Sequence, residues 1–169
     1  LILTNLSFSY SQINPLDVEI VRDNFGVPHI YGKTDADVAY GLAWSHAEDD
    51  FKTIQQGYLA GNGLLSKHIG IKGAGADFLS QLIESKETVD KLFSTLDSDF
   101  IKIIEAYSQG LNKYAETHPN EILEKKLFPI TPKKMTAYSF LQLFIANEAD
   151  KLVLSIINNK VPRENPFKD

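Results

Sequence analysis

The chain has 169 residues and a mass of 18.9 kDa, which is the size of one domain. Its composition, with 43% hydrophobic and 23% charged residues, excludes a disordered, collagen-like or coiled-coil protein. A net charge of −5 without a basic stripe argues against a nucleic-acid partner. No apolar run approaches the roughly 18 residues of a membrane span. Because the sequence has no cysteine, disulfides, thiol catalysis and zinc-thiolate sites are excluded.

A short strand pair is predicted over residues 17–31. Residues 17–22 are rich in β-branched side chains with rough alternation, which is typical of a strand. A turn is expected over 23–26, and residues 27–31 form the returning strand, with Pro28 near its start. The first part of the chain is therefore predicted to be a hairpin or two neighbouring strands.

The remainder, residues 34–158, is predicted to be mostly helical, so the fold class is α+β. Thr34 is a plausible N-cap of the first helix, and residues 99–117 show the apolar spacing of an amphipathic helix. The last helix, about 136–158, is apolar on nearly every side and should be buried by material from elsewhere. Residues 159–169 contain two prolines and are expected to form an irregular tail.

The standard catalytic signatures GxSxG, HExxH, Walker A and the EF-hand loop are absent from the sequence. The short Gly73-Ala74-Gly75 motif follows no clear strand, so a nucleotide site there is disfavoured. We expect the glycine-rich segment 70–75 to be a flexible loop.

The acidic cluster beginning at His46 allows two interpretations. His46 and Asp50 lie four residues apart and would share a helix face, with Asp49 beside them, so the cluster could hold a metal ion. Alternatively, the acids form a solvated helix end or an ion pair with a base such as Arg22, and this interpretation is favoured. His29, in the second strand, is expected to be a packed, hydrogen-bonded histidine.

Charged residues interrupt the apolar last helix at Glu148, Asp150 and Lys151. Burying an unpaired charge is costly, so a polar group in such a helix needs a partner or a role. Two hypotheses have equal weight. The charges form a buried ion pair, such as Glu148 with Lys151, or they make the polar edge of a cavity.

Several stretches resemble the α chain of the penicillin acylase family and occur in the same order as in that family. The resemblance extends from Val18 to about Leu152, and one departure is Asp50, where the family usually has arginine. The matching stretches are Val18–Tyr31 for the strand-pair pattern I-x-R-D-x-x-G-V-P-H-I, Tyr40–Ala43 with Ala47–Asp49, Gly63–Gly70, and Ala106–Asn112.

The resemblance implies a subunit of an N-terminal-nucleophile amidohydrolase made as a precursor. Autoproteolysis would release an α chain, a spacer and a larger β chain, and the two chains together would form an αββα sandwich. The new N-terminal Ser of the β chain would be the nucleophile, so this chain, which starts at Leu1, is expected to carry no catalytic residue. The implied substrate is a small acyl amide of the penicillin, cephalosporin or N-acyl-homoserine-lactone type.

The resemblance also bears on cofactors and location. No cofactor is implied as a requirement, although many family members bind calcium through one α-chain acid. Carried over without gaps, that position falls on Asn158, which is not an acid and argues against a calcium ligand there. The family is secreted to the periplasm or beyond. The start at Leu1, without Met or a basic leader, agrees with a processed product.

The resemblance assigns the acyl pocket to the stretch 144–152. Phe144 and Leu152 are expected to face the acyl chain and set its length, with Glu148 and Asp150 near the mouth or floor. Residue chemistry supports this prediction independently, because binding sites combine apolar walls with a few polar groups. The alternative from another class is a non-catalytic helical subunit that binds a partner without an N-terminal Ser.

Overall fold

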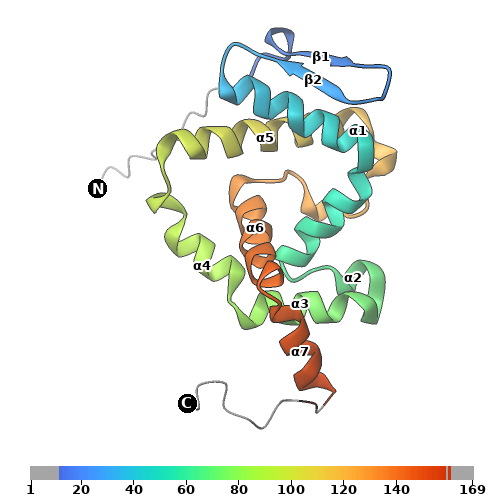
Figure 1. Cartoon of the computed structure of the whole chain (residues 1–169), viewed down its shortest axis with the longest axis vertical. Coiled ribbons are helices and arrows are strands. Elements are labelled where there is room, and N and C mark those ends of the chain that lie inside the picture. Colours follow the sequence, from blue (N-terminus) through green and yellow to red (C-terminus); the bar gives the residue numbers. More distant parts are fainter. Residues whose placement is uncertain (1–11, 159, 161–169) are drawn as a thin grey trace, which may run out of the picture. The chain divides into compact units, whose positions relative to one another are not determined.

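The computed structural model describes residues 12–158 and residue 160 (Figure 1). The expected irregular tail, 159–169, lies outside the described residues except for Lys160. The helices and strands are β1 (Glu19–Arg22), β2 (Pro28–Tyr31), α1 (Asp35–Gly61), α2 (Ser66–Ile69), α3 (Ala74–Leu82), α4 (Ser85–Leu92), α5 (Ser98–Thr117), α6 (Pro132–Ala146) and α7 (Ala149–Ile157).

The described residues fall into two compact units. One contains the residues up to Phe51 together with Leu96–Glu121, and the other contains Lys52–Thr95 and the residues from Ile122 onward. Helix α1 continues from the first unit into the second and leaves helical geometry at Asp50, where φ is −159° and ψ is 73°. The expectation of a single α-chain segment over 1–169 stays a prediction.

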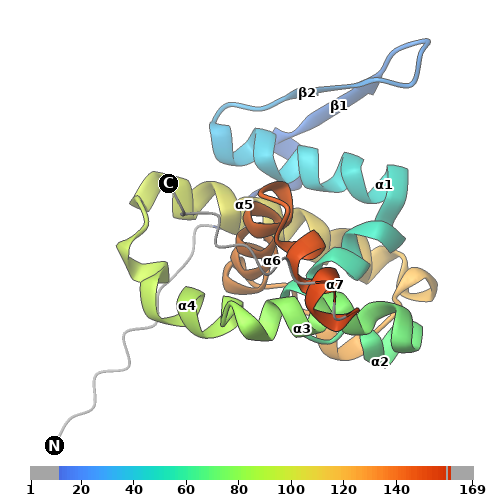
Figure 2. The ribbon, with the colours of Figure 1, turned by 60° about the horizontal axis from the view of Figure 1, so that its bottom comes forward.

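The first unit carries the predicted strand pair (Figure 2). Strands β1 and β2 are antiparallel, with Glu19 opposite Tyr31, which confirms the hairpin. The turn holds Gly26 at φ 82°, a conformation that glycine adopts without steric cost. Asp23 closes the turn, because its Oδ1 accepts hydrogen bonds from the backbone N–H groups of Phe25 (2.8 Å) and Val27 (3.0 Å).

Close backbone approach joins the elements of the first unit. A Cβ on Gly41 of α1 would lie 2.6 Å from Ile30 of β2, so the hairpin packs directly on this helix. A Cβ on Gly110 of α5 would lie 2.4 Å from the carbonyl oxygen of Tyr40 in α1. The buried positions of the amphipathic helix α5, such as Leu111 at 0% exposed, confirm its predicted apolar face.

The second unit is built around α6, which lies beside α4 and contacts α7 (Figure 1). Its core combines four side chains from α1, α3, α6 and α7, namely Ala60, Leu79, Leu141 and Val153. A Cβ on Gly61 would lie 2.3 Å from the Cα of Tyr138, so the end of α1 touches the α6 backbone. The buried Asp77 carboxylate accepts hydrogen bonds from the backbone N–H groups of Leu65 and Ser66, both at 2.8 Å.

Two local predictions are wrong. The segment 70–75 is not a flexible loop, because a 3₁₀ turn covers Gly70–Gly73 and α3 begins at Ala74. The predicted last helix is two helices, α6 and α7. Glu148, at φ 64°, leaves the right-handed helical region, and the Asn147 side chain donates to the carbonyl of Leu143 (2.7 Å). Asparagine side chains compete with helical backbone bonds in this way.

Candidate functional site

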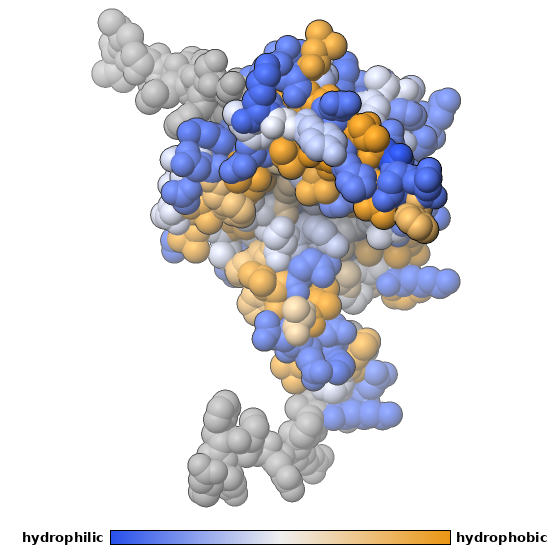
Figure 3. Space-filling view, turned by 45° about the horizontal axis from the view of Figure 1, so that its top comes forward, coloured by the Kyte–Doolittle hydropathy of each residue, from blue (hydrophilic) through white to orange (hydrophobic). Residues whose placement is uncertain are grey.

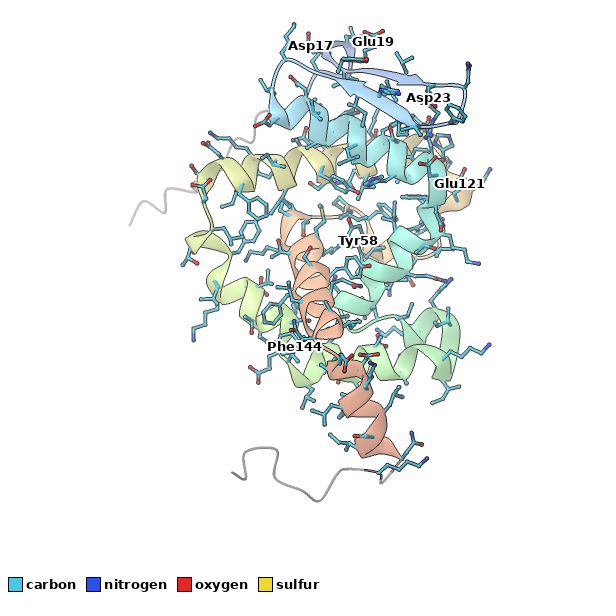
Figure 4. All side chains as sticks on the ribbon, viewed as in Figure 1. Asp17, Glu19, Asp23, Tyr58, Glu121 and Phe144 are labelled. Carbon is cyan, nitrogen blue, oxygen red and sulfur yellow. The ribbon has the colours of Figure 1, made fainter. Side chains whose placement is uncertain are left out.

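The residues assigned to the acyl pocket lie around the junction of α6 and α7. Phe144 is in the last turn of α6 (Figure 4), where 36% of it is exposed. Its ring makes an edge contact with Phe140, with centroids 5.3 Å apart. Phe144 is therefore anchored on one side by another aromatic ring and still presents an accessible apolar surface.

Leu152 lies on α7 and is 56% exposed. Its backbone N–H donates to the carbonyl oxygen of Glu148 (3.3 Å), so the first turn of α7 ties these two predicted pocket residues together. Asp150 is partly buried in the same turn. Whether Phe144, Glu148, Asp150 and Leu152 line one pocket stays a prediction.

The charges at the junction form an exposed ion pair. Lys151 Nζ lies 2.5 Å from Glu148 Oε1, and the two side chains are 67% and 68% exposed. The pairing expected from the sequence is present, but the expected burial is wrong. The helix break at Glu148 explains this difference, because it directs the pair to solvent instead of holding it inside a continuous helix.

Apolar side chains on both helices remain exposed in this chain, and the expected burial of the last helix by material from elsewhere stays a prediction. We call this set the junction surface. Figure 3 shows hydrophobic patches, in orange, on the part of the molecule that carries α7. The members of the junction surface, with their exposed fractions, are Leu143 (62%), Phe144 (36%), Leu152 (56%), Leu154 (53%) and Ile156 (45%).

The acidic residues that follow His46 pair with Arg22, as the favoured interpretation predicts. Arg22 Nη2 lies 2.8 Å from Asp49 Oδ1 and 3.1 Å from Glu48 Oε2. His46 Nδ1 lies 2.8 Å from the Tyr107 hydroxyl, a partner 61 residues away that the sequence did not suggest. Within residues 12–158 and 160, no three His, Asp or Glu side chains gather to hold a metal ion.

Two further predicted positions have local partners. His29 is hydrogen-bonded as expected, with Nε2 3.3 Å from Asp23 Oδ2, but 49% of its side chain is exposed, so it is not packed. Asn158 donates from its side-chain amide to the carbonyl of Leu154 (2.8 Å). Whether calcium binds stays an open prediction of the sequence.

Buried titratable groups on α5 were missed by the sequence analysis. Burial raises the pKa of Tyr107 to about 12 and raises the pKa of the Glu105 carboxyl above its usual range. The only available signal was their position on the apolar face of a helix, which does not separate a buried acid from one that reaches solvent.

No serine hydroxyl contacts a histidine ring in the part of the chain that the structure describes. Ser80 and Ser85 donate to the carbonyl of Gly61 at 2.9 and 2.8 Å, and Ser66 donates to Asp77. Serine hydrolysis needs a base beside the hydroxyl. The described residues therefore offer no serine–histidine pair.

None of the described helices is long and apolar enough to cross a bilayer.

A short antiparallel hairpin followed by packed helices defines a mainly helical α+β chain. Residues 17–164 match the penicillin amidase family, and the chain belongs to that family. The solved structure of a thermostable penicillin G acylase from Alcaligenes faecalis has a similar fold, with a TM-score of 0.62 and 15% identity. That match covers 90% of this chain and 94% of the other chain. The family prediction is thereby confirmed.

Curated relatives agree with this assignment. The chain is 22% identical over 140 residues to penicillin G acylase of Escherichia coli, which covers 80% of this chain and 16% of that protein. It is 22% identical over 120 residues to the acyl-homoserine lactone acylase PvdQ of Pseudomonas fluorescens, which covers 64% of this chain and 15% of that protein. The chain thus spans about a sixth of the length of these relatives.

Proposed function

We propose that this chain is the non-nucleophile subunit of an acylase that hydrolyses the amide bond between an acyl chain and an amine. Membership of the penicillin amidase family supports the reaction class. The observation that carries the subunit role is the junction surface, whose leucines and isoleucine are about half exposed. Exposed apolar side chains on two helices that contact each other support this role, because exposed apolar patches mark interaction or ligand-binding surfaces.

In this proposal a β chain from the same precursor supplies the chemistry. Its N-terminal Ser attacks the amide carbonyl, and its α-amine, with a pKa of about 8, takes the hydroxyl proton at neutral pH. Hydrogen-bond donors then stabilise the tetrahedral oxyanion.

The chain's own part is to form one wall of the acyl pocket. Phe144 and Leu152 provide accessible apolar surface on the two sides of the helix break, and the exposed Glu148 lies between them. An apolar wall beside a few polar groups is the usual composition of a small-molecule site. Substrates of the penicillin, cephalosporin or N-acyl-homoserine-lactone type fit this description, since each joins an acyl chain to an amine.

The cellular location of the protein also follows from the resemblance. We infer that the protein is periplasmic or secreted, as the family resemblance implies. Fractionation of cells that express the complete gene tests this inference, because activity confined to the cytoplasm would contradict it.

The subunit role is tested by separating the chains of the purified protein in denaturant. The fraction with this chain and the fraction with the larger chain are refolded alone and together, and hydrolysis of a phenylacetyl amide and an N-acyl-homoserine lactone is measured. Activity should return only in the mixture. Turnover by this chain alone would refute the proposal, and a mixture whose larger chain lacks an N-terminal Ser would favour a non-catalytic binding subunit.

A further inference from the structure

Four lysine side chains line one cavity in the second unit. The cavity has a volume of about 350 Å³, and one acid, Asp90, is found among its lining residues in the described part of the chain. The whole chain carries a net charge of −5, so this concentration of positive charge is a local feature. The lysines that line the cavity are Lys86, Lys126, Lys133 and Lys134.

Two of the four lysines are already held in place. Lys133 Nζ lies 2.9 Å from Asp90 Oδ1, which neutralises the single lining acid. Lys134 Nζ donates to the carbonyl oxygens of Leu127 (2.5 Å) and Pro129 (2.9 Å). Burial lowers the pKa of Lys134, because desolvation disfavours its charged form.

The other two lysines have no acidic partner in the part of the chain that the structure describes. Within the described residues, neither Lys86 on α4 nor Lys126 in the turn Lys125–Leu127 makes an ion pair. Among the described residues, the pair of Lys133 with Asp90 is the one ion pair found for the four lysines. Positive charges that share a concave surface reinforce each other's potential and concentrate anions there.

The start of α6 adds to this positive potential. Thr131, the N-cap of α6, lines the cavity together with Lys133 and Lys134 of the first turn. The N-terminal end of a 15-residue helix carries a partial positive charge, although Pro132 has no N–H and the Lys134 N–H donates to Thr131 Oγ1 (3.3 Å). The cavity also contains the side chain of Asn62, whose Nδ2 donates to the carbonyls of Tyr58 (2.7 Å) and Lys134 (3.2 Å).

We propose that this cavity is a binding site for a small, multiply charged oxyanion of the phosphate or sulfate type. Its volume lies near the lower end of the range for small-molecule pockets, which is about 300–1,000 Å³. The bound anion would bridge α4, the turn Lys125–Leu127 and α6. The site is separate from the proposed acyl pocket, because neither Phe144 nor Leu152 is among its lining residues.

The test is calorimetric titration of the complete protein with inorganic phosphate, with sodium chloride at equal ionic strength as the reference. Phosphate should bind saturably and raise the melting temperature, whereas chloride should do neither. The double variant Lys86→Gln with Lys126→Gln should weaken phosphate binding by about tenfold or more, because two charged donors are lost. Equal effects of phosphate and chloride would overturn the proposal.

The matched control is Lys91→Gln with Lys125→Gln. These lysines lie on α4 and in the same turn, carry the same charge and do not line the cavity. The control should change the affinity by less than about twofold, as expected for screened surface charges. A control that loses as much affinity as the test variant would show a general charge effect and overturn the site.

A second readout needs no variant. Phosphate should slow the reaction of Lys86 and Lys126 with an amine-acylating reagent in the complete protein, relative to Lys91 and Lys125, as measured by mass spectrometry of peptides. Equal labelling of all four lysines with and without phosphate would contradict the proposal.

Discussion

Leucine-to-alanine changes on the two sides of the α6–α7 junction separate a pocket residue from a core residue. Leu152 is 56% exposed and Leu141 is fully buried. Full burial of a leucine side chain contributes about 1.5–3 kcal/mol, so the partly buried Leu152 contributes roughly 1 kcal/mol within this chain. Leu141→Ala, which leaves a cavity in the core, should cost about 2–5 kcal/mol.

Leu152→Ala should change the acyl preference more than Leu141→Ala does, although it should cost less stability. If Leu152 forms part of the acyl pocket, Leu152→Ala should shift preference towards longer or bulkier acyl groups by about tenfold or more, since one methylene in a pocket discriminates by roughly 1–3 kcal/mol. Leu141→Ala should lower the melting temperature and leave the acyl preference unchanged. Phe144→Ala should behave like Leu152→Ala, with an added loss of about 0.5–1.5 kcal/mol from the contact with Phe140.

The assay is kcat/KM over a series of acyl lengths, measured beside the melting temperature of each variant. A large fall in melting temperature for Leu152→Ala, with a constant acyl profile, would refute the assignment. That result would place Leu152 in an interface core formed with the partner chain and remove it from the site.

Three further predictions test the described structure. Gly110→Ala should lower the free energy of unfolding by about 1–3 kcal/mol, because its Cβ would meet the Tyr40 carbonyl oxygen at 2.4 Å. Gly75→Ala in α3, with nothing within 4 Å of the added Cβ, should raise it by about 0.5–1 kcal/mol. Equal effects of the two changes in thermal unfolding would contradict the packing. Folding raises the pKa of Tyr107 from 10.0 to about 12, so its contribution to stability is complete below pH 10 and should be lost as the pH rises to about 12. Alkaline unfolding curves of Tyr107→Phe should lack this loss. Arg22→Gln should lower the melting temperature in dilute buffer and much less in 1 M salt, because its ion pairs are partly exposed; a loss independent of salt would point to its hydrogen bonds with backbone carbonyls instead.

Local sequence signals were sufficient for the first unit. The β-branched alternation and the Asp23–Gly26 turn predicted the hairpin, and the acids after His46 pair with Arg22 as favoured. Thr34 accepts a hydrogen bond from the Asp37 N–H (3.2 Å), as the N-cap prediction required. These features depend on residues close in sequence or on simple charge complementarity, which a single sequence records.

The tertiary structure of the second unit was harder to predict from the sequence. The apolar pattern around the α6–α7 junction suggested one continuous helix, because periodicity does not reveal that Asn147 and Glu148 end it. The same pattern predicted burial by material from elsewhere, and Leu154 and its neighbours are exposed in this chain alone. An apolar helix buried by its own chain has the same sequence signature as one that another surface covers.

The lysine-lined cavity could not be predicted from the sequence, because its lining residues are far apart along the chain. Lys86 and Lys126 are separated by forty positions, and the fold brings α4 and the turn Lys125–Leu127 to the same cavity. No charge run in the sequence marks the site, since the neighbouring acids Glu87 and Glu124 conceal the local excess.

The subunit role is tested most directly by mass spectrometry of the protein purified from its complete gene. The intact mass under native conditions, the masses after denaturation and the N-terminal residue of each chain are determined on one sample. We expect this chain to separate from a larger chain only in denaturant, and the larger chain to begin with Ser. A stable monomer of 18.9 kDa, or a partner chain with another N-terminal residue, would contradict the account.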